Sequence, residues 1–161
     1  MAQPLPQSVP GSVLFCCDHN AVRSPVAEGL MKKLHGSRVF VQSAGVHHDL
    51  DVDPFMVSVA GELDVDISQH RCKSFDEMEE WGDDMGSFDI VVALSPAAQR
   101  RALEYTRHFS IEVVYWPTLD PTGIGETRQQ KLDAYRQTRD QILNSIVAAF
   151  GPGEAANGLD A

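Results

Sequence analysis

The stretch VLFCCDHNAVRSPVAEGL, residues 13–30, connects a short apolar run to an amphipathic segment. The run SVLFCC, residues 12–17, is typical of a buried strand. Ser24 is a preferred N-cap residue, and Pro25 suits the first helical position, so we expect a helix from Ser24 that ends at Gly36. This part of the sequence therefore predicts a strand, a short loop and a helix in direct succession.

The same alternation continues along the chain. Strands are predicted at residues 38–45, 88–95 and 111–117, and helices at residues 53–63, 74–77, 95–109 and 127–150. Continuous apolar strands that alternate with helices favour an α/β fold, a parallel sheet with helices on both faces. Ligands of such sheets bind beyond the carboxyl ends of the strands, which makes the loop after Cys17 a candidate site.

Length and charge limit the classes of function. The 161 residues fit one domain, which we place at residues 12–150, with flexible tails at residues 1–11 and 151–161 that lack periodicity. The formal net charge of -10 repels a phosphate backbone and argues against nucleic-acid binding. The sequence has no signal-peptide pattern and no apolar run of membrane-spanning length, so we expect a cytoplasmic protein that does not bind membranes.

The cysteines favour free thiols. The chain has three of them, and Cys16 and Cys17 are neighbours, which makes a disulfide framework a poor interpretation. His19, His47 and His48 do not have the spacing of a zinc site. We therefore expect no metal and no cofactor.

The loop between strand and helix has the pattern C-x5-R, from Cys17 to Arg23. The first N–H groups of the following helix have no intrahelical acceptors, and together with the guanidinium they form a cradle for an anion. Such a cradle also stabilises a thiolate, the reactive form of cysteine. The alternation of a strand sends Cys16 to the opposite face, so we expect Cys17 to be the nucleophile and Cys16 a buried structural residue.

A cysteine that attacks phosphorus also needs an acid to protonate the departing oxygen. Two Asp-Pro pairs are candidates. Asp53 precedes an amphipathic helix, so capping explains it better. Asp120 follows the last predicted strand, at the same end of the sheet as Cys17, and is the candidate acid.

With these residues in place, the chain resembles the low-molecular-weight protein tyrosine phosphatases. The likeness covers residues 12–150 and includes, in the family's order, RSPVAEGL, SAGV, DPF, DISQHRCKSF, FDIVVALS and LDPTG. It implies a four-stranded parallel sheet in a three-layer α/β/α arrangement. It also implies hydrolysis of phosphate monoesters, with a phosphorylated protein or a small aryl phosphate as partner and inorganic phosphate as product.

The resemblance also implies roles for individual residues. Cys17 forms a phosphocysteine, Arg23 binds the phosphoryl oxygens, and Asp120 acts first as acid and then as base. The substrate-binding loop is formed by Asp18, His19, Asn20, Ala21, Val22 and Arg23. The residues that support this loop are Asn20, Ser24, Ser43 and His70.

The sequence departs from the family at several positions. His19 stands where glycine is usual, and Val22 where a second loop cysteine is common. Thr122 and Gly123 follow Asp120-Pro121 in place of aromatic residues, which leaves the walls of a phosphotyrosine slot undefined. Trp116 lies at a strand end and is expected in the core.

Two other functions remain open. One is a phosphate-binding or phosphoprotein-binding module of the same fold that has lost turnover, although binding alone requires neither Cys17 nor Asp120. The other is an arsenate reductase, which shares the fold and loop but relays a disulfide through two further cysteines after the third strand, where this chain has Ser95 and no cysteine. Cys72 lies elsewhere and is expected to be a free thiol.

Overall fold

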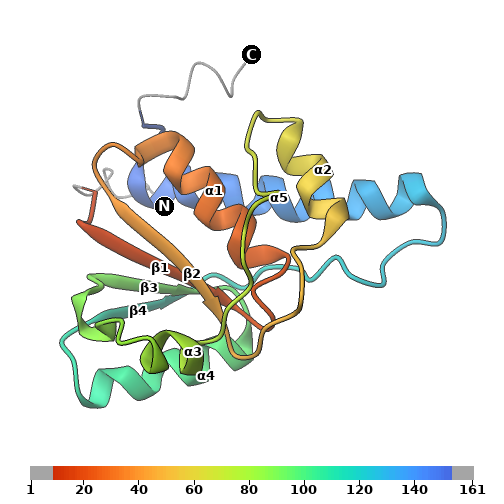
Figure 1. Cartoon of the computed structure of the whole chain (residues 1–161). Helices are drawn as coiled ribbons and strands as arrows, with labels where there is room; N and C mark the ends of the chain where they lie inside the picture. The colour runs from red at the N-terminus through yellow and green to blue at the C-terminus, as the bar shows by residue number, and fades with distance from the viewer. Residues whose placement is uncertain (1–8, 154–161) are drawn as a thin grey trace.

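The computed structural model describes residues 9–153 and contains one parallel sheet. Its strands are β1 (Ser12–Cys17), β2 (Phe40–Gly45), β3 (Ile90–Ala93) and β4 (Glu112–Tyr115), in the order β2-β1-β3-β4. β1 is central and pairs in parallel with β2 and β3. The carboxyl ends of all four strands therefore lie at one edge of the sheet, as Figure 1 shows.

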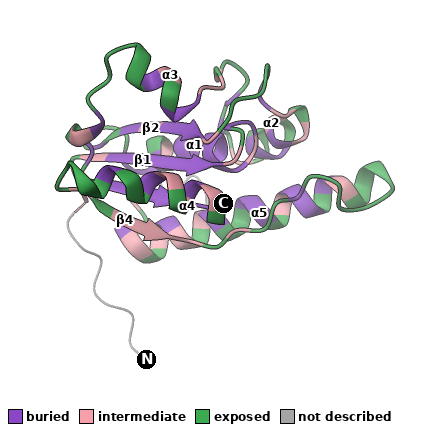
Figure 2. Ribbon diagram, turned by 90° about the horizontal axis from the view of Figure 1, so that it is seen from below, coloured by how far each residue is buried: buried purple, intermediate pink, exposed green. Residues whose placement is uncertain are grey.

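Helices cover both faces of this sheet, which confirms the predicted three-layer fold. The helices are α1 (Arg23–His35), α2 (Pro54–Gly61), α3 (Phe75–Glu80), α4 (Pro96–Leu103) and α5 (Arg128–Phe150). One core contains the apolar side chains of α1, α2 and α5, and a second core on the other face contains those of α3 and α4. Figure 2 shows β1 and β2 buried between these layers.

The strand that precedes the loop sends its two cysteines in opposite directions. Phe15 and Cys17 belong to the core beneath α1 and α5, whereas Leu14 and Cys16 belong to the core beneath α3 and α4. This follows from the two-residue repeat of a strand. The expectation that Cys16 points into the core is confirmed.

The helix caps agree with the sequence except at the functional loop. Asp53, Ser74 and Ser95 cap the helices that they begin, as their residue types predict, and Thr127 caps the last helix. The prediction that Ser24 caps α1 is wrong, because the helix begins at Arg23 and its N-cap residue is Val22, which has no capping side chain. The hydroxyl of Ser24 instead contacts the sulfur of Cys17, and this contact explains the difference.

The ends of the described chain contact the domain. The Gly11 amide donates to Asp89, and the Gly151 carbonyl contacts the ring of His35. Residues 1–8 and 154–161, the larger part of the proposed tails, lie outside the described residues. Within residues 9–153, no helix combines the length and apolar character that crossing a membrane requires.

Candidate active site

The loop from Cys17 to Arg23 is held from outside by the segment that follows β2. The carbonyls of Cys17, Asp18, His19 and Ala21 accept hydrogen bonds from the amides of Val46, His47, Asp49 and Asp53, at 3.0, 2.8, 3.2 and 2.9 Å. Within residues 9–153, the amides of residues 18–23 have no such acceptor. The carbonyls are thus used for support, and the N–H groups remain for a bound anion.

Gly45 makes this support possible. A Cβ atom at Gly45 would clash first with the His47 carbonyl oxygen, and it would lie 2.7 Å from the Asn20 amide nitrogen and 2.9 Å from the His19 carbonyl carbon. Real Cβ atoms do not approach other heavy atoms so closely. Glycine is therefore required at this position because the loop passes directly over the end of β2.

The nucleophile candidate is buried and hydrogen-bonded. Cys17 is 2% exposed, and its sulfur lies 3.0 Å from the Ser24 hydroxyl and 3.4 Å from the Ser24 amide nitrogen. The same hydroxyl accepts a hydrogen bond of 2.8 Å from the Asn20 side-chain amide. Because its lone pair is used by Asn20, the Ser24 hydroxyl can direct its proton toward a thiolate.

Asn20 is the centre of the supporting network. Its φ angle of 54° lies in the left-handed region, which asparagine tolerates better than most residues. Its side-chain nitrogen also donates to the Ser43 hydroxyl at 3.0 Å. Its side-chain oxygen accepts from His70 Nε2 at 3.0 Å and from the Lys73 amide at 2.9 Å. The structure thus brings together Asn20, Ser24, Ser43 and His70.

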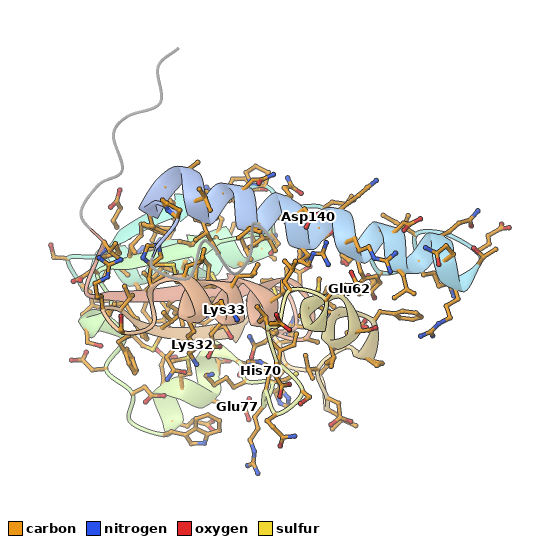
Figure 3. The ribbon with its side chains drawn as sticks, turned by 90° about the horizontal axis from the view of Figure 1, so that it is seen from above. Lys32, Lys33, Glu62, His70, Glu77 and Asp140 are labelled. Atoms are coloured by element: carbon orange, nitrogen blue, oxygen red, sulfur yellow. The ribbon has the colours of Figure 1, made fainter. Side chains whose placement is uncertain are left out.

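Glu28 belongs to this network and was not predicted from the sequence. Its carboxylate accepts hydrogen bonds from Ser43 and Lys32, and one oxygen lies 3.8 Å from His70 Nδ1. Figure 3 shows Lys32 and His70 on two neighbouring segments, α1 and the chain after α2. Glu28 lies one helical turn after Ser24, on the same side of α1, and this spacing is the signal that could have identified it.

The surroundings of His70 lower the pKa of its ring. Burial lowers the pKa of its ring, and the nearby charge of Lys73 adds to this, although Glu28 opposes it. A neutral ring with its proton on Nε2 donates to Asn20, as the geometry requires.

Arg23 places its guanidinium beside the loop. The side chain is 7% exposed, and its Nη1 donates to the Thr118 carbonyl at 2.9 Å. Its Nη2 lies 3.4 Å from Asp18 and 3.8 Å from Asp120. The Nη1 side of the guanidinium is therefore held by a backbone carbonyl, and the Nη2 side points toward the carboxylates of Asp18 and Asp120.

Asp120 lies in the exposed loop after β4. One carboxylate oxygen accepts from the Thr122 amide at 3.0 Å and from the Thr122 hydroxyl at 2.7 Å, and the other faces Arg23. Cys17, Arg23 and Asp120 line one small cavity of about 80 Å³. Its other lining residues are Asp18, His19, Ala21, Val22, Asp49, Asp53 and Thr122.

The walls of this cavity differ from a flat aromatic slot. His19 is half-exposed and contacts Asp49 at 3.4 Å and the ring of His47 at 5.8 Å. Among the described non-glycine residues, only Asn20 and Asp64 have positive φ angles, so His19 replaces a usual glycine without left-handed strain. Trp116 packs against Phe15 and belongs with the core, as expected.

The other thiols lack an activating environment. Burial, followed by the charge of Cys17, raises the pKa of Cys16 well above its ordinary value. Burial, followed by the charge of Asp49, raises the pKa of Cys72 to about 11. Within residues 9–153, no three His, Cys, Asp or Glu side chains are grouped to hold a metal ion.

Comparisons with known proteins identify relatives of this chain. The family model described as low molecular weight phosphotyrosine protein phosphatase matches residues 12–148. An arsenate reductase of Oceanobacillus iheyensis is 29% identical over 143 residues, which are 88% of this chain and 96% of that protein.

Solved structures extend the comparison to phosphatases. The low molecular weight protein tyrosine phosphatase of T. tengcongensis has a TM-score of 0.67 at 26% identity, and the match covers 85% of this chain and 95% of that one. The YwlE arginine phosphatase has a TM-score of 0.66 at 25% identity, with 85% of this chain and 91% of that one covered. The fold is thus shared by proteins whose substrates differ.

Proposed function

Since the chain belongs to the low molecular weight phosphotyrosine protein phosphatase family, we propose that it is a cysteine-dependent phosphatase that hydrolyses phosphate monoesters, with phosphotyrosine in proteins as the substrate class. The observation that carries the proposal is the cavity that Cys17, Arg23 and Asp120 line together, next to a loop whose N–H groups have no backbone acceptor within residues 9–153. These are a nucleophile, an anion-binding group and a proton donor in one place.

In the first step the Cys17 thiolate attacks phosphorus. A bond between sulfur and phosphorus forms, while the bond between phosphorus and the substrate oxygen breaks with its electron pair left on that oxygen. Protonated Asp120 gives its proton to the departing oxygen, which leaves as a phenol. Arg23 and the loop amides bind the phosphoryl oxygens and the charge that they carry in the transition state.

In the second step water attacks the phosphocysteine. The Asp120 carboxylate takes a proton from the water, an oxygen–phosphorus bond forms, and the Cys17 sulfur leaves as a thiolate. The Ser24 hydroxyl stabilises this leaving thiolate by its hydrogen bond. Inorganic phosphate departs, and the enzyme returns to its starting state with a protonated Asp120.

The relatives favour arsenate reduction as a second candidate function, since the curated match from Oceanobacillus iheyensis has this activity. The thiols of this chain argue against the usual relay. Cys16 is buried on the opposite face of the sheet, and the segment after β3 carries Ser95 in place of a cysteine. Arsenate has the tetrahedral shape of phosphate, so the same loop suits it. The segment after β3, however, lacks the second and third thiols that the relay needs for electron transfer.

The proposal is tested by steady-state hydrolysis of aryl phosphates whose phenols differ in acidity. We expect turnover by the wild type, with a maximum in mildly acidic solution, and none by Cys17→Ala. Asp120→Asn should slow phenyl phosphate by about 10²-fold and p-nitrophenyl phosphate much less, because an acidic phenol departs without a proton donor. Equal losses on both substrates would contradict the role of Asp120.

A binding module gives a different result. Folded wild type that binds vanadate but hydrolyses neither substrate would overturn the phosphatase proposal. Thiol-dependent reduction of arsenate without phosphatase turnover would favour the reductase.

A further inference from the structure

The cavity above Cys17 has an unusual distribution of charge. Four aspartates line it together with a single arginine, and we call them the acidic mouth: Asp18, Asp49, Asp53 and Asp120. The arginine is almost fully buried, whereas the side chains of Asp49 and Asp120 are 53% and 47% exposed. Positive charge therefore lies deep in the site and negative charge lies around its opening.

The partners of these aspartates leave the negative charge in place. Asp53 accepts from the Phe55 amide and the Tyr135 hydroxyl, both of them neutral donors. Asp120 accepts from Thr122 and lies 3.8 Å from Arg23. Asp49 faces His19, an ion pair only when that ring is protonated. Only Asp18 lies within 3.5 Å of the buried arginine. In the reactive enzyme Asp120 carries its catalytic proton, so one guanidinium and three carboxylates line the cavity.

The carboxylates add to the effect of burial on the pKa values of two neighbouring side chains. Burial raises the pKa of the Tyr135 phenol, and the hydrogen bond to Asp53 and the charges of Asp53 and Asp120 raise it further. The charge of Asp49 acts on Cys72 in the same direction. Both effects are those expected where carboxylates oppose a second negative charge.

A bound phosphopeptide meets both regions at once. Its phosphoryl group reaches the buried guanidinium and the loop amides, while the residues beside the phosphotyrosine lie at the mouth. Consecutive residues of an extended chain are about 3.5 Å apart, so the nearest neighbours fall within the screening length of about 8 Å at physiological salt. Acidic neighbours are repelled there and basic neighbours attracted, and the net charge of -10 acts in the same sense at longer range.

We propose that the acidic mouth selects phosphotyrosine that is flanked by lysine or arginine. This inference rests on the proposed phosphatase function and specifies its substrate class.

The test uses three phosphotyrosine peptides of equal length, flanked by lysine, alanine or glutamate. We expect kcat/KM of the wild type to be about 10-fold or more higher for the lysine peptide than for the glutamate peptide at low salt, and this ratio should approach one as salt rises. Asp49→Asn should lower the ratio about threefold. Asp83→Asn removes the same charge from an exposed position outside the cavity and should leave the ratio unchanged.

Measurements of peptide affinity test the acidic mouth separately from the proposed phosphatase activity. The dissociation constants of the same peptides are measured by calorimetry on Cys17→Ala, which cannot turn them over. Tighter binding of the lysine peptide supports the acidic mouth even if the wild type hydrolyses nothing, in which case only the phosphatase proposal fails. Equal affinities, or a preference for the glutamate peptide, overturn the acidic mouth even if every peptide is hydrolysed.

Discussion

The base of the cavity and its mouth are built in different ways. At the base, Asn20, Ser24 and Ser43 are completely buried, and each makes hydrogen bonds within one network that ends on Cys17. At the mouth, Asp49, Asp120 and His19 are about half-exposed and make few contacts. The base therefore fixes one geometry, which suits a reaction common to a family, whereas the mouth can change between relatives without disturbing that geometry.

This comparison predicts large effects at the base and small ones at the mouth. Apart from removal of the Cys17 nucleophile, the greatest effect should come from Arg23→Lys. A lysine keeps the positive charge but lacks the planar fork that binds two phosphoryl oxygens, so we expect kcat/KM for p-nitrophenyl phosphate to fall by about 10²-fold or more. Arg128→Lys makes the same exchange at the exposed start of α5 and should have no effect on steady-state rates. A fall in kcat/KM of less than tenfold for Arg23→Lys would show that a positive charge without the planar guanidinium is sufficient for catalysis.

The next effect should come from Gly45→Ala, which forces a Cβ atom against the backbone of the loop. We expect the free energy of unfolding to fall by about 1–3 kcal/mol and kcat/KM to fall about tenfold, because the loop must shift. Gly61→Ala is the matched control, since a Cβ atom there meets nothing within 4 Å. Equal stability of the two variants in urea unfolding would remove the requirement for glycine under the loop.

His19→Gly tests the mouth and should change little in catalysis. The backbone of His19 is not left-handed, so glycine relieves no strain there, and we expect kcat/KM for p-nitrophenyl phosphate to change by about threefold or less. Stability should fall by about 0.5–1 kcal/mol because glycine is more flexible in the unfolded chain. A tenfold gain in rate would instead show that the histidine holds the loop in a poor geometry.

The smallest effect should appear in the pH dependence of the free energy of unfolding. Burial lowers the pKa of His70 in the folded protein, so the unfolded chain binds this proton at a higher pH. The free energy of unfolding should therefore decline as the pH drops through about 6.5, the ordinary pKa of histidine.

His70→Gln tests whether His70 causes this decline in stability, because glutamine can still donate to Asn20 but does not take up a proton. The variant should lose less stability than the wild type between about pH 7.5 and about pH 5.5 in urea unfolding. His108→Gln, at an exposed position, should behave as the wild type does. Identical pH profiles for all three proteins would show that His70 is not held neutral.

The base of the site could be predicted from the sequence far better than the mouth. A strand, a loop and a helix in succession determine where Cys17 and Arg23 lie, because the elements are local and their periodicities differ. The resemblance assigned Ser24 to the support of the loop, and its residue type assigned it wrongly to the helix cap. In the structure its hydroxyl contacts the sulfur of Cys17. A hydrogen bond to sulfur competes with capping, and sequence statistics do not show which one is formed.

The acidic mouth depends on contacts between distant parts of the chain. Asp18, Asp49 and Asp120 come from three separate loops that meet only because the sheet brings its carboxyl ends to one edge. Asp53 was interpreted as a cap, which is correct, but the structure also places it in the wall of the cavity. Spacing along the chain carries no signal for such a ring of charges.

The most direct test of the account is to trap the covalent intermediate. Wild type and Cys17→Ala are mixed with p-nitrophenyl phosphate, quenched within one turnover and digested, and the peptides are analysed by mass spectrometry. The account predicts one added phosphoryl group on Cys17 in the wild type and no phosphorylated loop peptide in Cys17→Ala. Turnover that persists in Cys17→Ala, or a phosphoryl group on another residue of the wild type, would contradict it.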